Sequence, residues 1–373
     1  MKLNFSLAHT LAGSLTPAGP KAQAAAKRKA VEEMRYAALE AVDQVYAITG
    51  LAAAKNLQDS ELLILDRASW VKANTQSFEV LLAALAPQGL SDRLAALSGP
   101  EKRVTELGGA AELGGVLAFL STRVLGQYDP YAALAGHGAA GGRLMIVAPN
   151  LMKLEEELKL NPADFRLWVA LHEQTHRVQF AAAPWLRDHL LELMASLGQE
   201  LGQSGENLTD RIASAAASTL KGMQKGQGEE ASPETPQGGA ALLLSDQGRE
   251  VLDQITSIMS LLEGHANVVM DSVDPSLIPS VKTIRRRFED RSKNQGFLPR
   301  FMGKLLGMDA KMAQYRNGQK FVQAVVDQVG MELFNQVWLS AQNLPRLAEI
   351  QEPDLWVRRV LPSALEGLRE EDN

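Results

Sequence analysis

Two histidines lie four residues apart in the stretch LHEQTHRVQF, and a glutamate directly follows the first of them. Residues at this spacing lie on the same face of an α-helix, so His172 and His176 can hold one metal ion together. Glu173 is rotated by about 100° from His172 on such a helix. It would lie beside the ion without binding it, which suits a general base acting on a zinc-activated water. The HExxH pattern therefore predicts hydrolytic zinc chemistry.

The segment around this motif has its own helix start and stop signals. Asn161 is a favourable N-cap, Pro162 suits the first helical position, and Asp164 places a carboxylate where the helix dipole favours it. Pro184 follows the expected end, so we predict a helix from 162 to about 182. The alternative is an ordinary core helix with two incidental histidines. A third ligand decides between them, because catalytic zinc usually has three protein ligands and an open position.

The third ligand must be a histidine or a carboxylate, because the chain contains no cysteine. The zincin pattern with a third histidine ten residues after the first is excluded, since Ala182 occupies that place. A later helical stretch, GREVLDQITSIMSLLEGHANVVMD, offers Glu263 and His265. These two residues are about 200° apart around a helix, so both cannot face one ion.

We choose Glu263 as the third ligand and keep His265 as the alternative. The helix face of Glu263 is small and partly polar, so it can approach another helix closely; it contains Thr256, Met259, Ser260, Asn267 and Met270. The face of His265 is typical of core packing; it contains Ile258, Leu261 and Val269. Asn267, one turn after Glu263, and Asp271, a further turn on, are the predicted partners that orient the ligands.

Tyr315, in the stretch AQYRNG, is a polar residue in an otherwise apolar C-terminal region. Together with the neighbouring Arg316 it is a candidate for stabilising the oxyanion of a tetrahedral intermediate. Helix-end capping and surface contact are the competing roles, and the sequence favours them.

Composition and charge exclude several other classes of protein. The chain has 38 basic and 44 acidic residues, a net charge of −6 that does not favour nucleic acid or an anionic membrane surface. No apolar run approaches the ~18 residues of a membrane span. The glycines of GHGAAG at 136–141 precede a strand instead of following one, so no dinucleotide cofactor is expected. The N-terminus lacks the apolar region of a signal peptide, so we expect a cytoplasmic protein.

The apolar spacing predicts a mainly helical α+β protein with a small sheet. Helices are expected over 22–50, 77–86, 112–128 and 162–182. The run GRLMIVAPN predicts a short strand, Leu144–Ala148, stopped by Pro149. We expect this strand at the sheet edge beside the cleft, where an extended peptide can add as a further strand.

The chain is expected to form one structural unit with two parts. Residues 1–142 form an N-terminal helical part, and 143–373 form the zinc-binding core on which it packs. The stretch 221–240 lacks apolar periodicity and is rich in Gly, Pro, Glu and Gln, so it predicts a mobile loop within the core.

The stretch HEQTHRVQF, followed later by LLEGHANVVMD, resembles a family of prokaryotic proteins. These are regarded as zinc-dependent metallopeptidases or hydrolases with a zincin-like fold, and some bear a name linked to biosynthesis of a deazaflavin coenzyme. VLGQYDPY at 124–131, LMIVAPNL at 144–151 and AQYRNGQKFVQAV at 313–325 also look like the family. The resemblance therefore covers most of the chain.

This resemblance implies a zincin-like core in which His172, His176 and Glu263 bind Zn²⁺ and Glu173 is the base. We predict a zinc-dependent hydrolase, a gluzincin-like peptidase, that acts on a peptide or other amide substrate. The rival prediction is a non-catalytic scaffold or binding protein that keeps the fold and the metal. A role as a factor in coenzyme biosynthesis rests on the family's name alone. Substrate and oligomeric state stay open.

Overall fold

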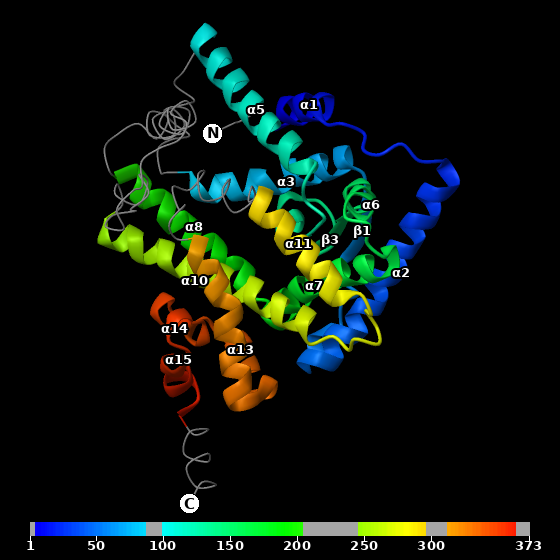
Figure 1. Ribbon diagram of the computed structural model, residues 1–373. Coiled ribbons are helices and arrows are strands. Elements are labelled where there is room, and N and C mark those ends of the chain that lie inside the picture. The colour runs from blue at the N-terminus through cyan, green and yellow to red at the C-terminus, as the bar shows by residue number, and fades with distance from the viewer. Residues whose placement is uncertain (1–3, 87–98, 204–244, 296–311, 363–373) are drawn as a thin grey trace, which may run out of the picture.

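The computed structural model describes residues 4–86, 99–203, 245–295 and 312–362. Helices dominate this part of the chain and surround a small sheet (Figure 1). The longer helices are α1 (Phe5–Leu15), α2 (Ala24–Thr49), α3 (Arg67–Leu85), α5 (Gly99–Ser121), α6 (Ala148–Glu157), α7 (Pro162–Ala182), α8 (Leu186–Gln203), α10 (Asp246–Asp271), α11 (Val281–Gln295) and α13 (Met312–Phe334). Two short helices, α14 (Leu347–Gln351) and α15 (Pro353–Val360), follow. The predicted mainly helical α+β class is confirmed.

The sheet contains β1 (Glu61–Leu65), β2 (Gly126–Asp129) and β3 (Arg143–Val147), in the order β1-β3-β2. β3 pairs in parallel with β1 and antiparallel with β2. The sheet thus joins strands from both predicted parts of the chain.

The predicted strand exists, one residue earlier than expected, but its predicted edge position is wrong. β3 is the central strand of the sheet, and all five of its residues are buried. The reason is its composition: a continuous apolar run without alternation suits a strand covered on both faces. β2 is the edge strand nearest the HExxH helix, since β2 and α7 pack together.

The helix predicted over 112–128 is only partly correct. α5 ends at Ser121, and the last residues of that stretch form β2. The side chain of Asn150, in α6, donates hydrogen bonds to the carbonyl oxygens of Ser121 (2.8 Å) and Val124 (2.6 Å). These bonds satisfy carbonyl groups at the helix end, and the Val147 amide then donates to Leu125 O at 2.8 Å. A partner far along the chain therefore ends the helix.

A buried ion pair within the sheet is connected to α3 by hydrogen bonds. The Nε atom of Arg143 lies 3.0 Å from Oδ2 of Asp129, and both side chains are almost fully buried. Arg143 also donates to Ala73 O (2.6 Å), and Ser77 donates to Asp129 (2.5 Å). Such a pair is tolerated in a core because further hydrogen bonds satisfy both charged groups.

The local signals predicted α2 and α7 well. α2 ends at Gly50, whose φ of 67° is left-handed and whose amide bonds Tyr46 O at 2.8 Å. At the start of α7, Asn161 Oδ1 accepts from the amides of Ala163 (3.0 Å) and Asp164 (3.3 Å).

α7 lies at the centre of the molecule, against α2 on one side and α10 on another (Figure 1). α10 in turn packs closely on α13. A Cβ atom added to Gly264 would lie 2.3 Å from the carbonyl carbon of Gly318, and one added to Gly318 would lie 2.0 Å from Ser260 O. Only glycine allows this approach, which holds the segment around Glu263 firmly between α7 and α13.

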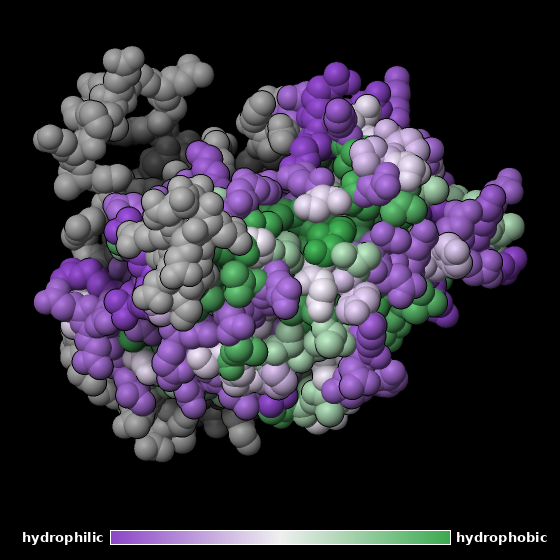
Figure 2. Space-filling view, turned by 90° about the horizontal axis from the view of Figure 1, so that it is seen from below, coloured by the Kyte–Doolittle hydropathy of each residue, from purple (hydrophilic) through white to green (hydrophobic). Residues whose placement is uncertain are grey.

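The main hydrophobic core joins α2, α7, α10 and α13, and a smaller core around Trp70 and Leu117 lies between the sheet, α3 and α5. Figure 2 shows one face of the molecule, where hydrophobic side chains emerge among hydrophilic ones. Within the described residues, no helix combines the length and apolar character that crossing a membrane requires.

Candidate metal centre

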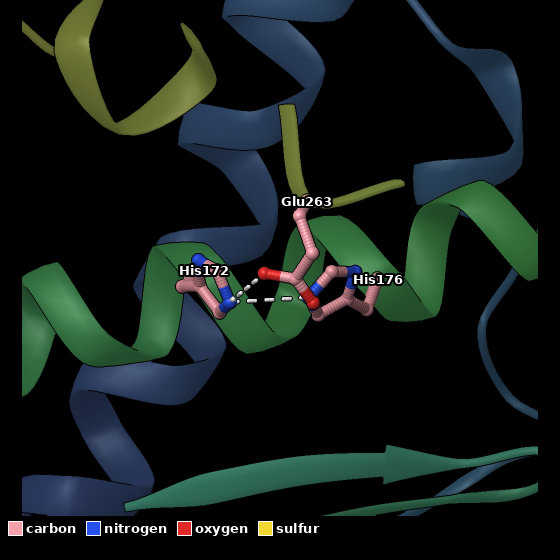
Figure 3. Close-up of side chains that lie close together, drawn as sticks. All are labelled: His172, His176 and Glu263. Carbon is pink, nitrogen blue, oxygen red and sulfur yellow. Dashed lines mark hydrogen bonds and ion pairs between the residues drawn. The ribbon is translucent and has the colours of Figure 1, made fainter. Parts of the chain in front are cut away.

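Three side chains converge between α7 and α10. His172 and His176 project from α7, and Glu263 reaches toward both rings from α10 (Figure 3). The two Nε2 atoms are 3.1 Å apart. Glu263 places one carboxylate oxygen 3.6 Å from His172 Nε2 and the other 3.5 Å from His176 Nε2. The structure thus brings together the three residues that the sequence singled out as ligands.

These distances fit a zinc ion. Ligand atoms at 2.0–2.1 Å from zinc in a tetrahedral arrangement lie about 3.3 Å from one another. The separation of the two Nε2 atoms and the separations from each Nε2 to the nearer oxygen of Glu263 lie close to that value, although the two histidines face different oxygens of the carboxylate. The side chains of His172, His176 and Glu263 are 23%, 15% and 39% exposed, so the cluster is reachable from solvent. A three-residue donor set that water can reach is the arrangement expected of a catalytic zinc site.

Burial keeps His172 in the form that can bind a metal. Desolvation, with His176 adjacent, lowers the pKa of His172 to about 4, although Glu263 opposes the shift. The imidazole is therefore neutral near pH 7, and a neutral imidazole has a lone pair to offer.

Glu173 is buried beside the cluster and under the sheet edge. A Cβ atom added to Gly126, the first residue of β2, would lie 2.5 Å from Glu173 Cγ and 2.8 Å from its Oε1. Burial, and then the charge of Glu263, raise the pKa of Glu173 well above its usual value. Glu173 is therefore largely shielded from solvent beside the two histidines.

The Nδ1 atoms of the two histidines have different partners. His176 Nδ1 lies 2.9 Å from Oε1 of Gln179, whereas His172 Nδ1 lies 3.2 Å from the sulfur of Met270. An amide oxygen is a strong acceptor and a thioether a weak one, so His176 is held more firmly.

His265 points away from the cluster. Its ring is fully buried and packs on Phe334 and Trp338, with centroids 5.5 Å and 5.3 Å away. Burial, with a contribution from His176, lowers its pKa to about 3. Its role in the structure is that of a neutral core histidine, while Glu263 faces the two α7 rings.

The two residues expected to orient the ligands lie further along α10 than Glu263. Asn267 is half-buried and lies one turn after Glu263 on the same helix. Asp271 pairs with Arg285 of α11 and accepts from Gln319 of α13 at 2.6 Å. Both lie on the ligand face of α10, but a helix rises about 1.5 Å per residue, so they are displaced along it from the cluster.

Tyr315 belongs to α13, but its side chain and that of Arg316 lie outside the described part of the structure. The predicted loop 221–240 also lies outside the described residues.

The sequence reasoning missed the roles of Gln179 and Gly126. Gln179 is a polar residue on the ligand face, one turn after His176 in HEQTHRVQF, and this position was its only signal. Gly126 lies far from the motif in sequence, and nothing local links it to Glu173. Both residues acquire these contacts only when segments distant in sequence pack together.

Comparison with known proteins agrees with this geometry. The model of the zincin-like metallopeptidase family matches residues 3–357. A crystal structure from Chloroflexus aurantiacus, described as that of a candidate hydrolase with a novel fold, is similar to this chain with a TM-score of 0.65 and 28% identity. The similarity covers 95% of this chain and 97% of the other. No curated protein matches the chain. The family match extends over nearly the whole chain and includes the HExxH helix and its distant glutamate, so this protein belongs to the zincin-like metallopeptidase family.

Proposed function

We propose that this protein binds one zinc ion through His172, His176 and Glu263 and hydrolyses peptide or other amide bonds. One observation carries the proposal: three donor groups from two helices lie 3.1–3.6 Å apart and stay partly exposed. Family membership supports a metal at this place and hydrolysis as its use.

When bound, a zinc ion supplies Lewis acidity, which makes a water molecule more acidic and polarises a carbonyl group. The chain supplies the proton transfers. Glu173 takes the proton of the attacking water and passes it to the leaving nitrogen, so that a carbon–oxygen bond forms as the carbon–nitrogen bond breaks.

The sheet offers a place for an extended substrate. In the described part of the chain β2 pairs only with β3, so one side of β2 lacks a strand partner. Gly126 of this strand contacts Glu173. A peptide that adds to β2 would therefore pass beside the proposed base, and main-chain hydrogen bonds would hold it there.

The test joins metal analysis to a cleavage assay. The purified protein should contain zinc near one equivalent and should cleave members of a broad peptide library. Glu173→Gln keeps the size of the side chain but removes its basicity. We expect this variant to retain zinc and to lose about 10²- to 10⁴-fold in hydrolysis rate.

Two results would count against the proposal in different ways. If Glu173→Gln cleaves as fast as the wild type, Glu173 is not the base. Zinc binding without cleavage of any library member favours the non-catalytic scaffold instead.

A further inference from the structure

Gln179 occupies a fully buried position between the two helices that carry the proposed ligands. It lies on α7, one turn after His176, and its amide has three polar neighbours. Oε1 is 2.9 Å from His176 Nδ1, while Nε2 is 2.9 Å from the backbone oxygen of Leu262 and 3.0 Å from Nδ1 of His265.

The backbone oxygen of Leu262 determines which way this amide points. A carbonyl oxygen can only accept, so the NH₂ group of Gln179 must face it. The amide oxygen is then left to face His176. Reversing the amide would set two oxygens against each other in a buried place, which is costly. The orientation therefore follows from hydrogen-bond logic alone.

This orientation selects one tautomer of His176. An amide oxygen can only accept, so the Nδ1 atom of His176 must carry the proton. A neutral imidazole has a single N–H, which leaves Nε2 with a free lone pair. That Nε2 is the atom 3.1 Å from His172 and 3.5 Å from Glu263. The tautomer set by Gln179 is thus the one that can bind a metal in the cluster.

The second N–H of the amide reaches His265. This bond requires Nδ1 of His265 to accept, so His265 carries its proton on Nε2. His265 therefore ends a chain of hydrogen bonds that runs through Gln179 to His176.

We propose that Gln179 is a positioning residue that holds His176 in its metal-binding tautomer and links the two ligand-bearing helices. The inference rests on the proposed zinc site. Leu262 directly precedes Glu263. The side-chain amide of Gln179 therefore connects His176 on α7 to the backbone beside Glu263 on α10. Outer hydrogen-bond partners of this kind typically contribute 10- to 100-fold to metal affinity.

A matched pair of variants tests the affinity. Gln174 is also a fully buried amide on α7, but it donates to Ala38 O of α2 at 2.6 Å, away from the cluster. Gln179→Leu and Gln174→Leu each remove one buried glutamine, so both should lower thermal stability. Only Gln179→Leu should raise the zinc dissociation constant, by about 10- to 100-fold, in competition with a chromophoric chelator. Equal zinc affinity in the two variants would overturn the proposal.

The tautomers can be measured in the metal-free wild type, which keeps the test valid even if Gln179→Leu fails to fold. Long-range ¹H–¹⁵N spectra of protein with ¹⁵N-labelled histidine should show His176 protonated at Nδ1 and His265 at Nε2. Protonation of His176 at Nε2 would refute the inference. This measurement needs neither zinc nor turnover, so a wild type that binds no zinc would disprove the metal site separately.

Discussion

Glu263 and His265 leave the same helix in different directions. The carboxylate of Glu263 lies 3.6 Å from His172 Nε2, whereas the ring of His265 is buried against Phe334. Residues two apart on a helix differ by about 200°, so the structure separates a candidate ligand from a core residue.

This difference predicts unequal effects on zinc. Glu263→Ala removes a proposed ligand, so its zinc affinity should fall by more than the 10- to 100-fold that loss of an outer partner causes. His265→Ala should lower affinity by at most about 10-fold, because it acts only through Gln179. Isothermal titration with zinc measures both. A larger loss in His265→Ala would mean that the ligand assignment on α10 is wrong.

Removal of zinc should destabilise the protein. A ligand that binds only the folded state, at 100 times its dissociation constant, stabilises that state by about 2.7 kcal/mol. Treatment with a chelator should therefore lower the melting temperature, and added zinc should restore it.

The same melting experiment has a histidine control. His176→Ala should show no response to zinc, whereas replacement of the exposed loop residue His137 by alanine should leave the response intact. A zinc-dependent shift that persists in His176→Ala would place the metal elsewhere.

Gly126→Ala should impair catalysis without removing the metal. The added methyl group would lie 2.5 Å from Glu173 Cγ, so the carboxylate must move. A displacement of about 1 Å at a reacting group can reduce the rate by about 10²-fold. Metal analysis should still find zinc, because the three ligands come from α7 and α10.

Gly115→Ala is the control for this change, since a Cβ atom there meets nothing within 4 Å. Full peptide hydrolysis by Gly126→Ala would show that Glu173 tolerates the contact, or that it is not the base.

The ion pair between Glu349 and Arg359 predicts a pH-dependent stability. Burial acts to raise the pKa of Glu349, but hydrogen bonds from Arg359 and the Arg346 amide outweigh it and hold the pKa below the usual value of 4.5. The carboxylate therefore stabilises the fold above about pH 4.5, and this contribution disappears as the pH falls through the lowered pKa.

Glu349→Gln should thus be less stable than the wild type at pH 7, by about 1.5–3 kcal/mol, because it removes the charge from a hydrogen-bonded ion pair. The difference should shrink in acid. Urea unfolding of both proteins at pH 7 and below pH 4 measures it. A difference that stays constant with pH would show that Glu349 does not titrate as the geometry implies.

The helix that carries the HExxH motif could be predicted from residues that lie close together in the chain. Asn161, Pro162 and the apolar spacing act within a few residues of one another, so they predict α7 and place His172 and His176 on one face. Helical rotation predicted the position of Glu173 beside the histidines, and the small, partly polar helix face of Glu263 favoured it over His265 as the third ligand. Local rules were sufficient for α7 and for the shared face of its histidines, because caps and helical spacing act within a few residues, whereas the approach of Glu263 from α10 is a long-range contact.

Tertiary structure alone decided the rest. β3 is central instead of at the edge because β1, from a distant part of the chain, pairs on the side opposite β2. Asn150 ends α5 from another helix, and Gly126 reaches Glu173 across the sheet edge. Gln179 obtains its role only when α10 places Leu262 O beside it. Each of these contacts joins segments far apart in sequence, and no local propensity or period records which distant groups will meet once the core closes.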